Sequence, residues 1–485
     1  MQSSNQSSNG EHKYFRTISW LRRDLRLSDH RALFEACRQS EEVLVAFVFD
    51  ENILEKLNSK MDARVGYIHQ SLLELDATLR ARGSALTWLV GDPVVEIPKL
   101  AIHARCQAVF CNEDYEAYGK ARDEKVARTL SEQGIDFHRF KDHVIFSGSE
   151  VEKADGTPYR VFTPYKKIWL KKLAEDFVNP LKPDLGRLLS KKHFGVKAGP
   201  LSLKRIGFTQ SASRLLAGEA AANSLLRNFQ NKLHQYAETR DFPGLDSTSR
   251  MSVHLRFGTI SIRACVRACW PAESNGAQTW LNELIWRDFY HMVLDRFPHV
   301  EKKAFLLKYE SIKWPGKYQH FKAWREGRTG FPIVDAAMRQ LNQTGFMHNR
   351  LRMVVASFLV KDLLIDWRKG EAYFAVKLLD YDKAANNGGW QWCASTGCDA
   401  QPFFRIFNPL SQSLRFDAEG VFIRKFVPEL AQFSNRDIHV PDQAKVKNIP
   451  RGFVLGRDYP KPVVTHSQQI RRAVLLYREE KNTSR

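Results

Sequence analysis

The sequence has no run of eighteen apolar residues, and such a run is what predicts a helix that crosses a membrane. Its seven cysteines are few for 485 residues, and no two of them form a CxxC pair. An odd number of scattered cysteines in a long chain favours reduced thiols and argues against a zinc site. We therefore expect a cytoplasmic protein with no membrane span, no disulfide framework and no bound metal.

Several familiar motifs are also missing. The first expected strand runs directly into RRDLRLSD (22–29), which contains no glycine, so the GxGxxG dinucleotide fingerprint is absent. No P-loop, nucleophile elbow, zinc-binding helix or kinase motif occurs. The chain therefore does not hold a dinucleotide or a triphosphate in the usual ways, and its chemistry must come from other residues.

What the sequence has in abundance is positive charge. Lys and Arg number 74 against 54 Asp and Glu, which gives a net charge of +20 and a pI near 9.6. Such a balance favours a polyanionic partner, nucleic acid before membrane, with an ordinary enzyme of basic surface as the alternative. The polar residues 1–12 lack the apolar segment of a signal peptide, so we expect a disordered tail there.

The pattern of apolar residues predicts an α/β domain at residues 13–145. Short apolar runs rich in β-formers alternate with helical patterns, and the expected strands are 17–21, 43–50, 85–91 and 108–112. Strands that alternate with helices predict a doubly wound parallel sheet.

The rest of the chain has a different composition. Residues 146–205 are rich in Pro, Gly and Lys, as expected for a long linker. Residues 206–485 lose the strand signals and repeat apolar residues every three to four positions, which predicts a large all-helical domain. This part holds eight of the eleven tryptophans. Within it, NNGGWQWCASTGCDAQPFFRIFNP (386–409) fits neither a simple helix nor a strand pattern.

The segment WLNELIWRDFYH (280–291) could form the wall of a binding site. On a helix, Glu283, Trp286, Arg287 and Tyr290 share one side. The indole offers a stacking surface for a nucleic-acid base, and the carboxylate can hydrogen-bond the edge of that base. On these residues alone, a core tryptophan beside an exposed ion pair is the favoured alternative.

Three further segments could take part in chemistry. In GFMHNRLRM (345–353), Asn349 and Met353 face one way on a helix, and the neighbouring arginines suit phosphate contacts. The turn at 246–250, DSTSR, could hold a pyrophosphate through its N–H groups, although a helix cap is the commoner explanation. Asp380 and Asp382 stand just before the first of the two asparagines.

Taken together, these segments resemble the photolyase/cryptochrome family, most closely the bacterial class I cyclobutane pyrimidine dimer DNA photolyases. The resemblance runs from about residue 16 to about residue 465 and is more specific in the C-terminal half. The matching stretches are WLRRDLRLSDHRAL, YRVFTPYKKIWL, RDFPGLDSTSRMSVHLRFG, WLNELIWRDFY, GFPIVDAAMRQLNQTGFMHNRLRMVVASFLVKDLLIDWRKGE and LDYDKAANNGGWQWCASTGCDAQPFFRIFNP.

The resemblance implies an N-terminal α/β domain, a long linker and a helical domain that buries FAD. By position, Asp380 and Asp382 would address the isoalloxazine, with Arg352 paired to Asp380 beneath the ring. Asn386 would face the flavin N5, and the adjacent glycines would let the backbone approach the cofactor. The residues expected at the ribose and pyrophosphate are Tyr236, Thr248, Ser249, Arg250, Met251 and Ser252.

The resemblance also implies a light-driven reaction on DNA that contains pyrimidine dimers. Trp390, Trp367 and Trp314 would pass electrons to the flavin under light, and Trp392 would serve packing alone. Reduced FAD would then donate an electron to a dimer that has left the duplex. The dimer pocket would consist of Glu283, Trp286, Asn349 and Met353, with the DNA strand contacted by Arg240, Arg287, Arg350 and Gln412. We expect a monomer in the bacterial cytosol.

The second chromophore and the exact activity stay open at this point. Tyr118-Gly119 stand where folate-binding members have Asn-Glu, whereas Lys302 matches a folate-contacting lysine. Methenyltetrahydrofolate, an 8-hydroxydeazaflavin and an empty antenna site are therefore alternatives. A cryptochrome blue-light receptor, a (6-4) photolyase and a non-catalytic DNA-binding flavoprotein are the alternative functions. The preference between duplex and single-stranded DNA also stays open.

Overall fold

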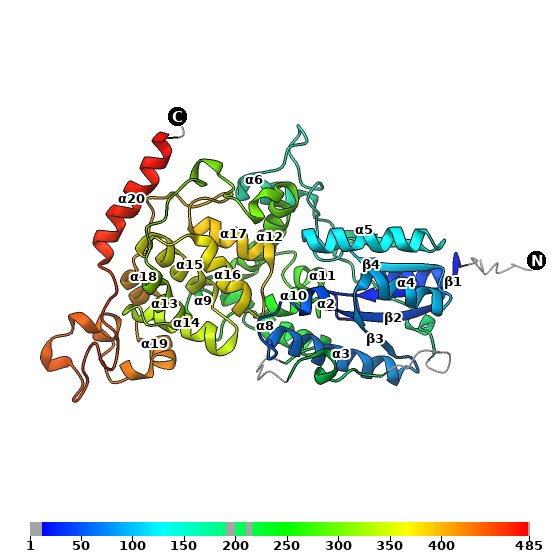
Figure 1. The fold of residues 1–485 in the computed structure, drawn as a ribbon, viewed down its shortest axis with the longest axis horizontal. Coiled ribbons are helices and arrows are strands. Elements are labelled where there is room, and N and C mark those ends of the chain that lie inside the picture. The colour runs from blue at the N-terminus through cyan, green and yellow to red at the C-terminus, as the bar shows by residue number, and fades with distance from the viewer. Residues whose placement is uncertain (1–11, 191–198, 210–215, 484–485) are drawn as a thin grey trace, which may run out of the picture. The chain divides into compact units, whose positions relative to one another are not determined.

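The computed structural model of the chain describes residues 12–190, 199–209 and 216–483 (Figure 1). The chain forms two compact units. Unit 1 comprises Met1–Ile145, Glu175–Ser224 and Phe257–Cys265, and unit 2 comprises Phe146–Ala174, Leu225–Arg256 and Val266–Arg485. Of the tail predicted at residues 1–12, only residue 12 lies within the described part.

Unit 1 is built on one sheet of five parallel strands, in the order β3-β2-β1-β4-β5. Ile18 of β1 pairs with Leu44 on one side and with Val109 on the other, so β1 lies in the middle. An order that runs outward in both directions from the first strand is a doubly wound sheet, which confirms the predicted fold class. The strands are β1 (Tyr14–Leu21), β2 (Ser40–Asp50), β3 (Leu86–Gly91), β4 (Ala108–Asn112) and β5 (Asp136–Phe140).

The fifth strand was not predicted from the sequence. Its residues, DFHRF, place two polar side chains between Phe137 and Phe140, so they show neither strict alternation nor a continuous apolar run. Because β5 lies at the edge of the sheet, one side of its backbone needs no strand partner and its side chains need not all be apolar.

Helices cover both faces of this sheet. In Figure 1, α5 lies on one side of the strands and α3 on the other. Asp62 and Asp92 cap α3 and α4 by accepting hydrogen bonds from backbone N–H groups two residues on, at 2.9 Å each. The helices are α1 (Arg31–Gln39), α2 (Glu51–Leu54), α3 (Ala63–Ala81), α4 (Pro93–His103), α5 (Ala117–Ser131) and α7 (Glu175–Val178).

The compact units divide residues 146–265 differently from the predicted domains. Residues 146–174 belong to unit 2, because α6 (Phe162–Lys172) packs on its central helix α12 (Asn275–Arg296). Residues 257–265 belong to unit 1, because Arg263 donates to Asp29 and to Asp142 at 2.7 Å each. The functional boundaries proposed at 145 and 205 stay a prediction.

All five strands of the described residues lie in unit 1, and the elements of unit 2 are helices, as predicted. The connection from unit 1 runs through α8 (Glu219–Gln230), α10 (Ser252–Phe257) and α11 (Ile262–Arg267). The other helices are α9 (Tyr236–Thr239), α13 (Tyr318–Glu326), α14 (Pro332–Thr344), α15 (Asn349–Ser357), α16 (Trp367–Lys377), α17 (Lys383–Cys393), α18 (Pro409–Phe416), α19 (Val421–Phe426) and α20 (His466–Thr483).

Helix α17 covers part of the stretch in which no helix pattern was recognised. Asp382 caps it by accepting a hydrogen bond from the N–H of Ala385 (3.1 Å). A Cβ on Gly388 would come within 2.2 Å of the Tyr290 ring, so this glycine lets α17 lie close against α12. No helix was predicted here because glycine is a poor helix former and two glycines are adjacent in this segment.

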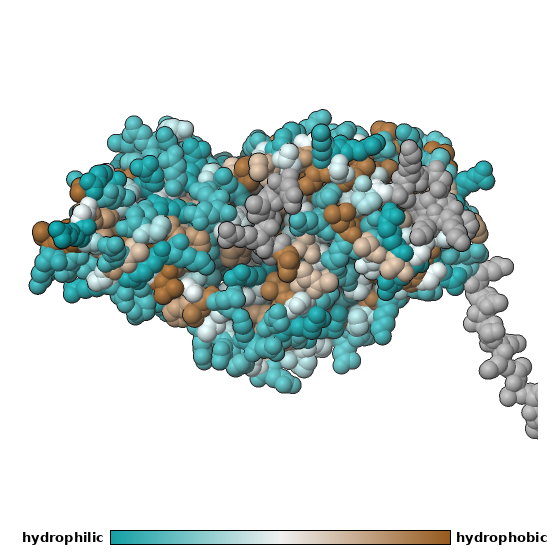
Figure 2. Space-filling view, turned by 90° about the horizontal axis from the view of Figure 1, so that it is seen from below, coloured by the Kyte–Doolittle hydropathy of each residue, from teal (hydrophilic) through white to brown (hydrophobic). Residues whose placement is uncertain are grey.

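The core of unit 2 consists mainly of large aromatic and aliphatic side chains from α13 to α19. Trp324, Phe358, Trp367 and Trp390 are all buried in it. No helix of the described residues is long and apolar enough to cross a membrane. The face drawn in Figure 2 is mostly hydrophilic, with apolar residues scattered over it in small groups.

Candidate functional site

Helix α12 presents the wall that was predicted from WLNELIWRDFYH. Ser274 caps the helix by accepting a hydrogen bond from the N–H of Ala277 (3.1 Å). Glu283, Trp286, Arg287 and Tyr290 are all half-buried, as a shared side at the edge of the core requires. The predicted side of the helix therefore exists, and its composition suits contact with a flat, polar-edged group.

Trp286 does not lie free on this wall. Its ring stacks on Phe162 of α6, with 3.8 Å between the centroids and 6° between the planes. Tyr290 lies 5.4 Å away at 36°. One face of the indole is therefore covered by Phe162, and this stack fixes the orientation of the ring.

Glu283 is held by an arginine. Nη1 of Arg240 donates to Oε1 of Glu283 at 2.7 Å. Burial lowers the pKa of Arg240, but Glu283 and its neighbours more than offset this, so the pKa lies above its usual value. The guanidinium also lies 5.5 Å from the centroid of the Tyr236 ring. Arg240, predicted to contact DNA, thus lies beside the predicted dimer pocket.

A second predicted DNA contact, Arg350, lies in the same neighbourhood. Its Nη2 donates to Asp241 at 2.7 Å, and its guanidinium lies 4.6 Å from the centroid of Phe416 at the end of α18. Gln412 is also on α18, and its Oε1 is buried without a hydrogen-bond partner among the described residues. Arg287 lies one turn after Glu283 on α12. The structure therefore groups the four predicted DNA-binding residues on adjoining elements of unit 2.

Helix α15 places Asn349 and Met353 one turn apart. His348 caps this helix by accepting a hydrogen bond from the N–H of Arg350 (3.2 Å), which is a structural role. Asn349 is exposed, while Met353 is half-buried against the core. That these two residues share a pocket with the α12 wall stays a prediction.

The predicted pair beneath the flavin is present. Nη2 of Arg352 donates to Oδ2 of Asp380 at 2.7 Å, and the Asp380 side chain is only 1% exposed. The other carboxylate oxygen, Oδ1, is buried and has no hydrogen-bond partner among the described residues. A buried carboxylate oxygen without a partner is costly, so this atom suits a ligand that donates a hydrogen bond.

The two other residues expected at the isoalloxazine are held by their neighbours. Asp382 caps α17 and lies 3.5 Å from Nε2 of His291. Nδ2 of Asn386 donates to the side chain of Glu371 at 2.9 Å and to its backbone carbonyl at 3.2 Å. The amide nitrogen is thus engaged by Glu371, which leaves the carbonyl oxygen to face a ligand.

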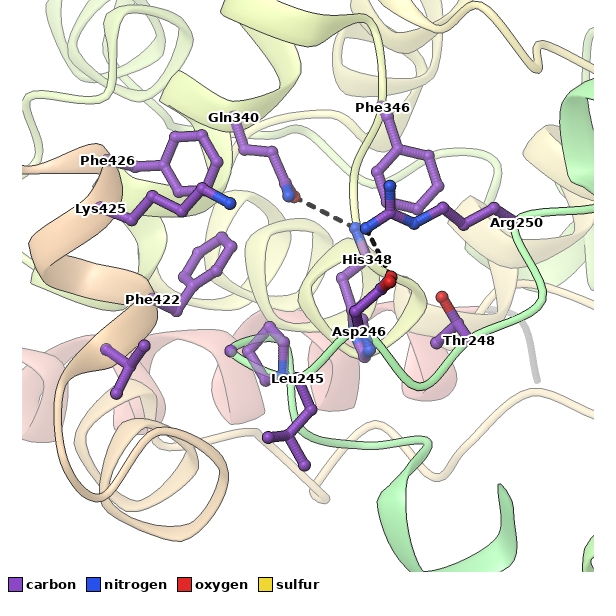
Figure 3. Close-up of a pocket in the computed structure, with 13 residues that line it drawn as sticks. Leu245, Asp246, Thr248, Arg250, Gln340, Phe346, His348, Phe422, Lys425 and Phe426 are labelled. Carbon is purple, nitrogen blue, oxygen red and sulfur yellow. Dashed lines mark hydrogen bonds and ion pairs between the residues drawn. The ribbon is translucent and has the colours of Figure 1, made fainter. Parts of the chain in front are cut away.

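The DSTSR turn borders a pocket of about 100 Å³ (Figure 3). Arg250 has a positive φ of 52° and pairs with Asp246 at 2.8 Å, while Nε1 of Trp280 donates to Ser249 at 3.3 Å. Of the residues predicted to bind the cofactor, Thr248 and Arg250 line the pocket. Its other lining residues are Pro243, Gly244, Leu245, Asp246, Gln340, Phe346, His348, Val421, Phe422, Lys425 and Phe426.

These features fit a flavin dinucleotide. The turn offers hydroxyl groups and backbone N–H groups of the kind that hold a pyrophosphate, and Met251 and Ser252 follow it directly in the chain. Tyr236, the remaining residue predicted here, lies buried at the start of α9. The unpartnered oxygen of Asp380 would accept from a ring N–H. A Cβ on Gly389 would meet open space, so the backbone of α17 is accessible at that position.

The three tryptophans of the predicted electron path differ in burial. Trp390 and Trp367 are buried, whereas Trp314 is half-buried and meets Tyr477 of α20 edge to face at 6.0 Å. A Cβ on Gly370 would lie 2.1 Å from the Trp390 ring, so this indole rests on the backbone of α16, three residues after Trp367. Trp392 packs on the core, as predicted. Of the three, Trp314 alone reaches the surface, as the outermost member of such a path must, and the path itself stays a prediction.

Sequence reasoning missed several residues of this site. Phe162, Asp241 and Glu371 are the partners of Trp286, Arg350 and Asn386, yet none of them is near its partner in the sequence. All three do occur in matching stretches: Phe162 in YRVFTPYKKIWL, Asp241 in RDFPGLDSTSRMSVHLRFG, and Glu371 at the end of the stretch 330–371. Resemblance was therefore the one signal available. Trp280 was counted among the tryptophans but not assigned to the DSTSR turn.

Comparison with known proteins identifies the family of the chain. Residues 17–183 match the family model described as DNA photolyase, and residues 280–479 match the FAD binding domain of DNA photolyase. The deoxyribodipyrimidine photo-lyase of Alkalihalophilus pseudofirmus is 39% identical over 95% of this chain and 97% of its own.

Solved structures give the same result. The structure of a bacterial class III photolyase from Agrobacterium tumefaciens has a TM-score of 0.89 and 34% identity, covering 98% of this chain and all of its own. A cryptochrome from Synechocystis is similar with a TM-score of 0.84 and 27% identity, over 96% of this chain and all of its own. The chain therefore belongs to the DNA photolyase family and is an FAD-dependent lyase of the deoxyribodipyrimidine photo-lyase type.

Proposed function

We propose that this protein repairs cyclobutane pyrimidine dimers in DNA by light-driven electron transfer. The observation that supports it best is the grouping of Trp286 and Glu283 on one side of α12 with Arg240 and Arg350 beside them. A stacking surface, a hydrogen-bonding carboxylate and two guanidinium groups meet the needs of a flipped nucleotide and its backbone.

Each predicted site residue would have a separate role in binding the damaged DNA. Trp286, fixed by Phe162, would stack on the dimer, and Glu283 would hydrogen-bond its pyrimidine edge. Arg240, Arg287, Arg350 and Gln412 would contact the DNA strand, with Asn349 and Met353 lining the cavity. Exclusion of water from this cavity would strengthen each polar contact to the charge that develops on the dimer.

The cofactor would be held by the residues around Asp380. Arg352 keeps the carboxylate of Asp380 in place, so that its free oxygen can accept a hydrogen bond from the ring system. Glu371 fixes the amide of Asn386 in the same way. Reduced FAD, when bound and excited by blue or near-UV light, supplies the electron that splits the dimer. Trp390, Trp367 and Trp314 would relay electrons inward from the surface.

The direct test uses an oligonucleotide with a single thymine dimer. The purified protein, reduced and illuminated, should restore the intact thymines, while a dark sample should not. A matched oligonucleotide with a (6-4) lesion distinguishes the alternative photolyase activity. Light-independent restoration, or restoration of the (6-4) lesion alone, would refute the proposal. Failure to restore either lesion would favour the cryptochrome alternative.

A further inference from the structure

Asp241 lies between two arginines that the proposed function assigns to DNA. Its Oδ2 accepts from Nη2 of Arg350 at 2.7 Å, and its Oδ1 lies 3.8 Å from Nε of Arg240. Arg240 in turn donates to Glu283 at 2.7 Å. The four side chains form an alternating row, Glu283–Arg240–Asp241–Arg350, which we call the ion row.

The ion row lies where solvent can reach it. The side chain of Arg350 is 19% exposed and that of Asp241 is 30% exposed. Arg350 is held from another direction by the ring of Phe416, which also meets Phe242 edge to face at 6.1 Å. The guanidinium is therefore fixed in place at the surface, and a carboxylate occupies one of the N–H donors that a phosphate could use.

A carboxylate and a phosphate compete for the same donors. Each offers paired oxygens that match the planar fork of an arginine. A phosphate that approaches Arg350 also meets the negative charge of Asp241 at close range, and like charges repel. A phosphate that takes the Nη2 donor of Arg350 therefore has to displace the carboxylate or share the donor with it.

We propose that Asp241 is an internal competitor for the DNA backbone, which occupies Arg350 until a phosphate displaces it. This inference rests on the proposed function, because it needs Arg350 to contact DNA. Its effect is to weaken binding to any strand, which matters for a protein of net charge +20 that must leave undamaged DNA in order to find rare lesions.

The test is the affinity of Asp241→Asn for an undamaged duplex. Glu429→Gln is the matched control, because Glu429 pairs with Arg339 at 2.8 Å with similar exposure (25% and 20%) and its removal changes the net charge equally. Asp241→Asn should bind about two- to fivefold more tightly than the control, the range that a partly exposed ion pair gives. Affinity equal to or below that of the control would overturn the proposal, since Asp241 would then only orient Arg350.

A double-mutant cycle separates competition from simple local charge. In an Arg350→Ala background, Asp241→Asn should gain clearly less affinity than in the wild type, because the guanidinium it frees is absent. An equal gain in both backgrounds would overturn the proposal. Asp241→Ser provides a second neutral variant if the asparagine rearranges the segment. The wild type reports on the proposed function separately, through its restoration of a thymine dimer in light.

Discussion

Oδ2 of Asp380 accepts a hydrogen bond from Nη2 of Arg352 at 2.7 Å, and Oδ1 is buried without a hydrogen-bond partner among the described residues. The pair therefore defines both the position and the direction of a hydrogen-bond acceptor at the predicted flavin site. Arg352 is the more exposed partner, with 27% of its side chain accessible against 1% for Asp380. Loss of the arginine would leave this buried carboxylate without an ion-pair partner among the residues that the structure describes.

The first prediction follows from this pair. Arg352→Ala should lose most of its FAD and unfold more readily. Removing one partner of a buried ion pair costs about 3–5 kcal/mol of folding free energy. Because Arg352 is partly exposed, we expect a loss near the lower end of this range. Arg339→Ala, which breaks the Arg339–Glu429 pair, is the matched control. The ratio of flavin to protein absorbance checks this, and a normal ratio in Arg352→Ala would contradict it.

The second prediction concerns the outermost tryptophan. Trp314→Phe should fold normally, because a ring is kept against Tyr477, but should no longer accumulate reduced flavin in light. The chemically reduced variant should still repair dimers. Trp392→Phe, assigned to packing, should photoreduce as the wild type does. Absorbance spectra recorded under illumination give the answer, and normal photoreduction of Trp314→Phe would remove this residue from the path.

The third prediction concerns the carboxylate of the α12 wall. Glu283→Ala should bind dimer-containing DNA about 1–3 kcal/mol more weakly, the usual loss when a buried polar group is left without its partner. Glu283→Gln should lose less, since its carbonyl still accepts from a pyrimidine N–H. The yield of repair per absorbed photon at saturating DNA should also fall in Glu283→Ala, with flavin content unchanged. A wild-type yield would mean that Glu283 serves only to hold Arg240.

The fourth prediction tests the stack beneath Trp286. Phe162→Leu should weaken binding to dimer-containing DNA by about 0.5–1.5 kcal/mol, because the indole loses its parallel partner at 3.8 Å. Binding to an undamaged duplex should not change, since Phe162 is not among the backbone contacts. Titrations of both DNAs provide the comparison. Equal losses on both would show that the variant disturbs the fold and not the orientation of Trp286.

The fifth prediction is a dependence of stability on pH. Lys361 is fully buried, with Nζ 2.9 Å from Ser395 and 3.8 Å from the centroid of Tyr477, and burial lowers its pKa to about 7. Between pH 10 and pH 7 the unfolded chain binds a proton that the folded chain does not, so stability falls as pH falls through this range. Below pH 7 both states bind it and the loss is complete.

Lys361→Met should therefore match the wild type near pH 10 and exceed it at pH 6. The stability advantage of Lys361→Met at pH 6 should exceed that at pH 10 by about 4 kcal/mol, since burial lowers the pKa of Lys361 from 10.5 to about 7 and each pKa unit is worth about 1.4 kcal/mol. Lys369→Met removes the same charge from an exposed position and serves as the control. Urea unfolding at the two pH values measures this, and a difference that does not vary with pH would rule the explanation out.

Local patterns were enough to predict the elements and some of their faces. Four of the five strands and the shared side of Glu283, Trp286 and Tyr290 follow from periodicity, which depends on residues close in the sequence. The fold class and the Arg352–Asp380 pair were also correct, the pair through resemblance alone. Helix α17 was not predicted, because glycine is a poor helix former. The reason for a glycine at position 388 is its close contact with the Tyr290 ring, which the sequence does not reveal.

The contacts that complete the site could not be predicted in this way. Asp241 and Arg350 are 109 residues apart, and the pairing depends on how α9 and α15 pack in unit 2. The stack of Phe162 on Trp286 likewise depends on α6 lying against α12. Tertiary packing determines such partners, and local propensity and residue spacing carry no information about it.

The position of α6 limits how the protein can be divided. Trp169 of α6 donates to Asp288 of α12 at 3.1 Å, and Phe162 and Tyr165 pack on Phe289. A recombinant fragment that begins at residue 206 would lack all three and would present the apolar side of α12 to water. A truncated protein meant to keep flavin should therefore retain residues 146–174, either in the same chain or supplied as a separate peptide.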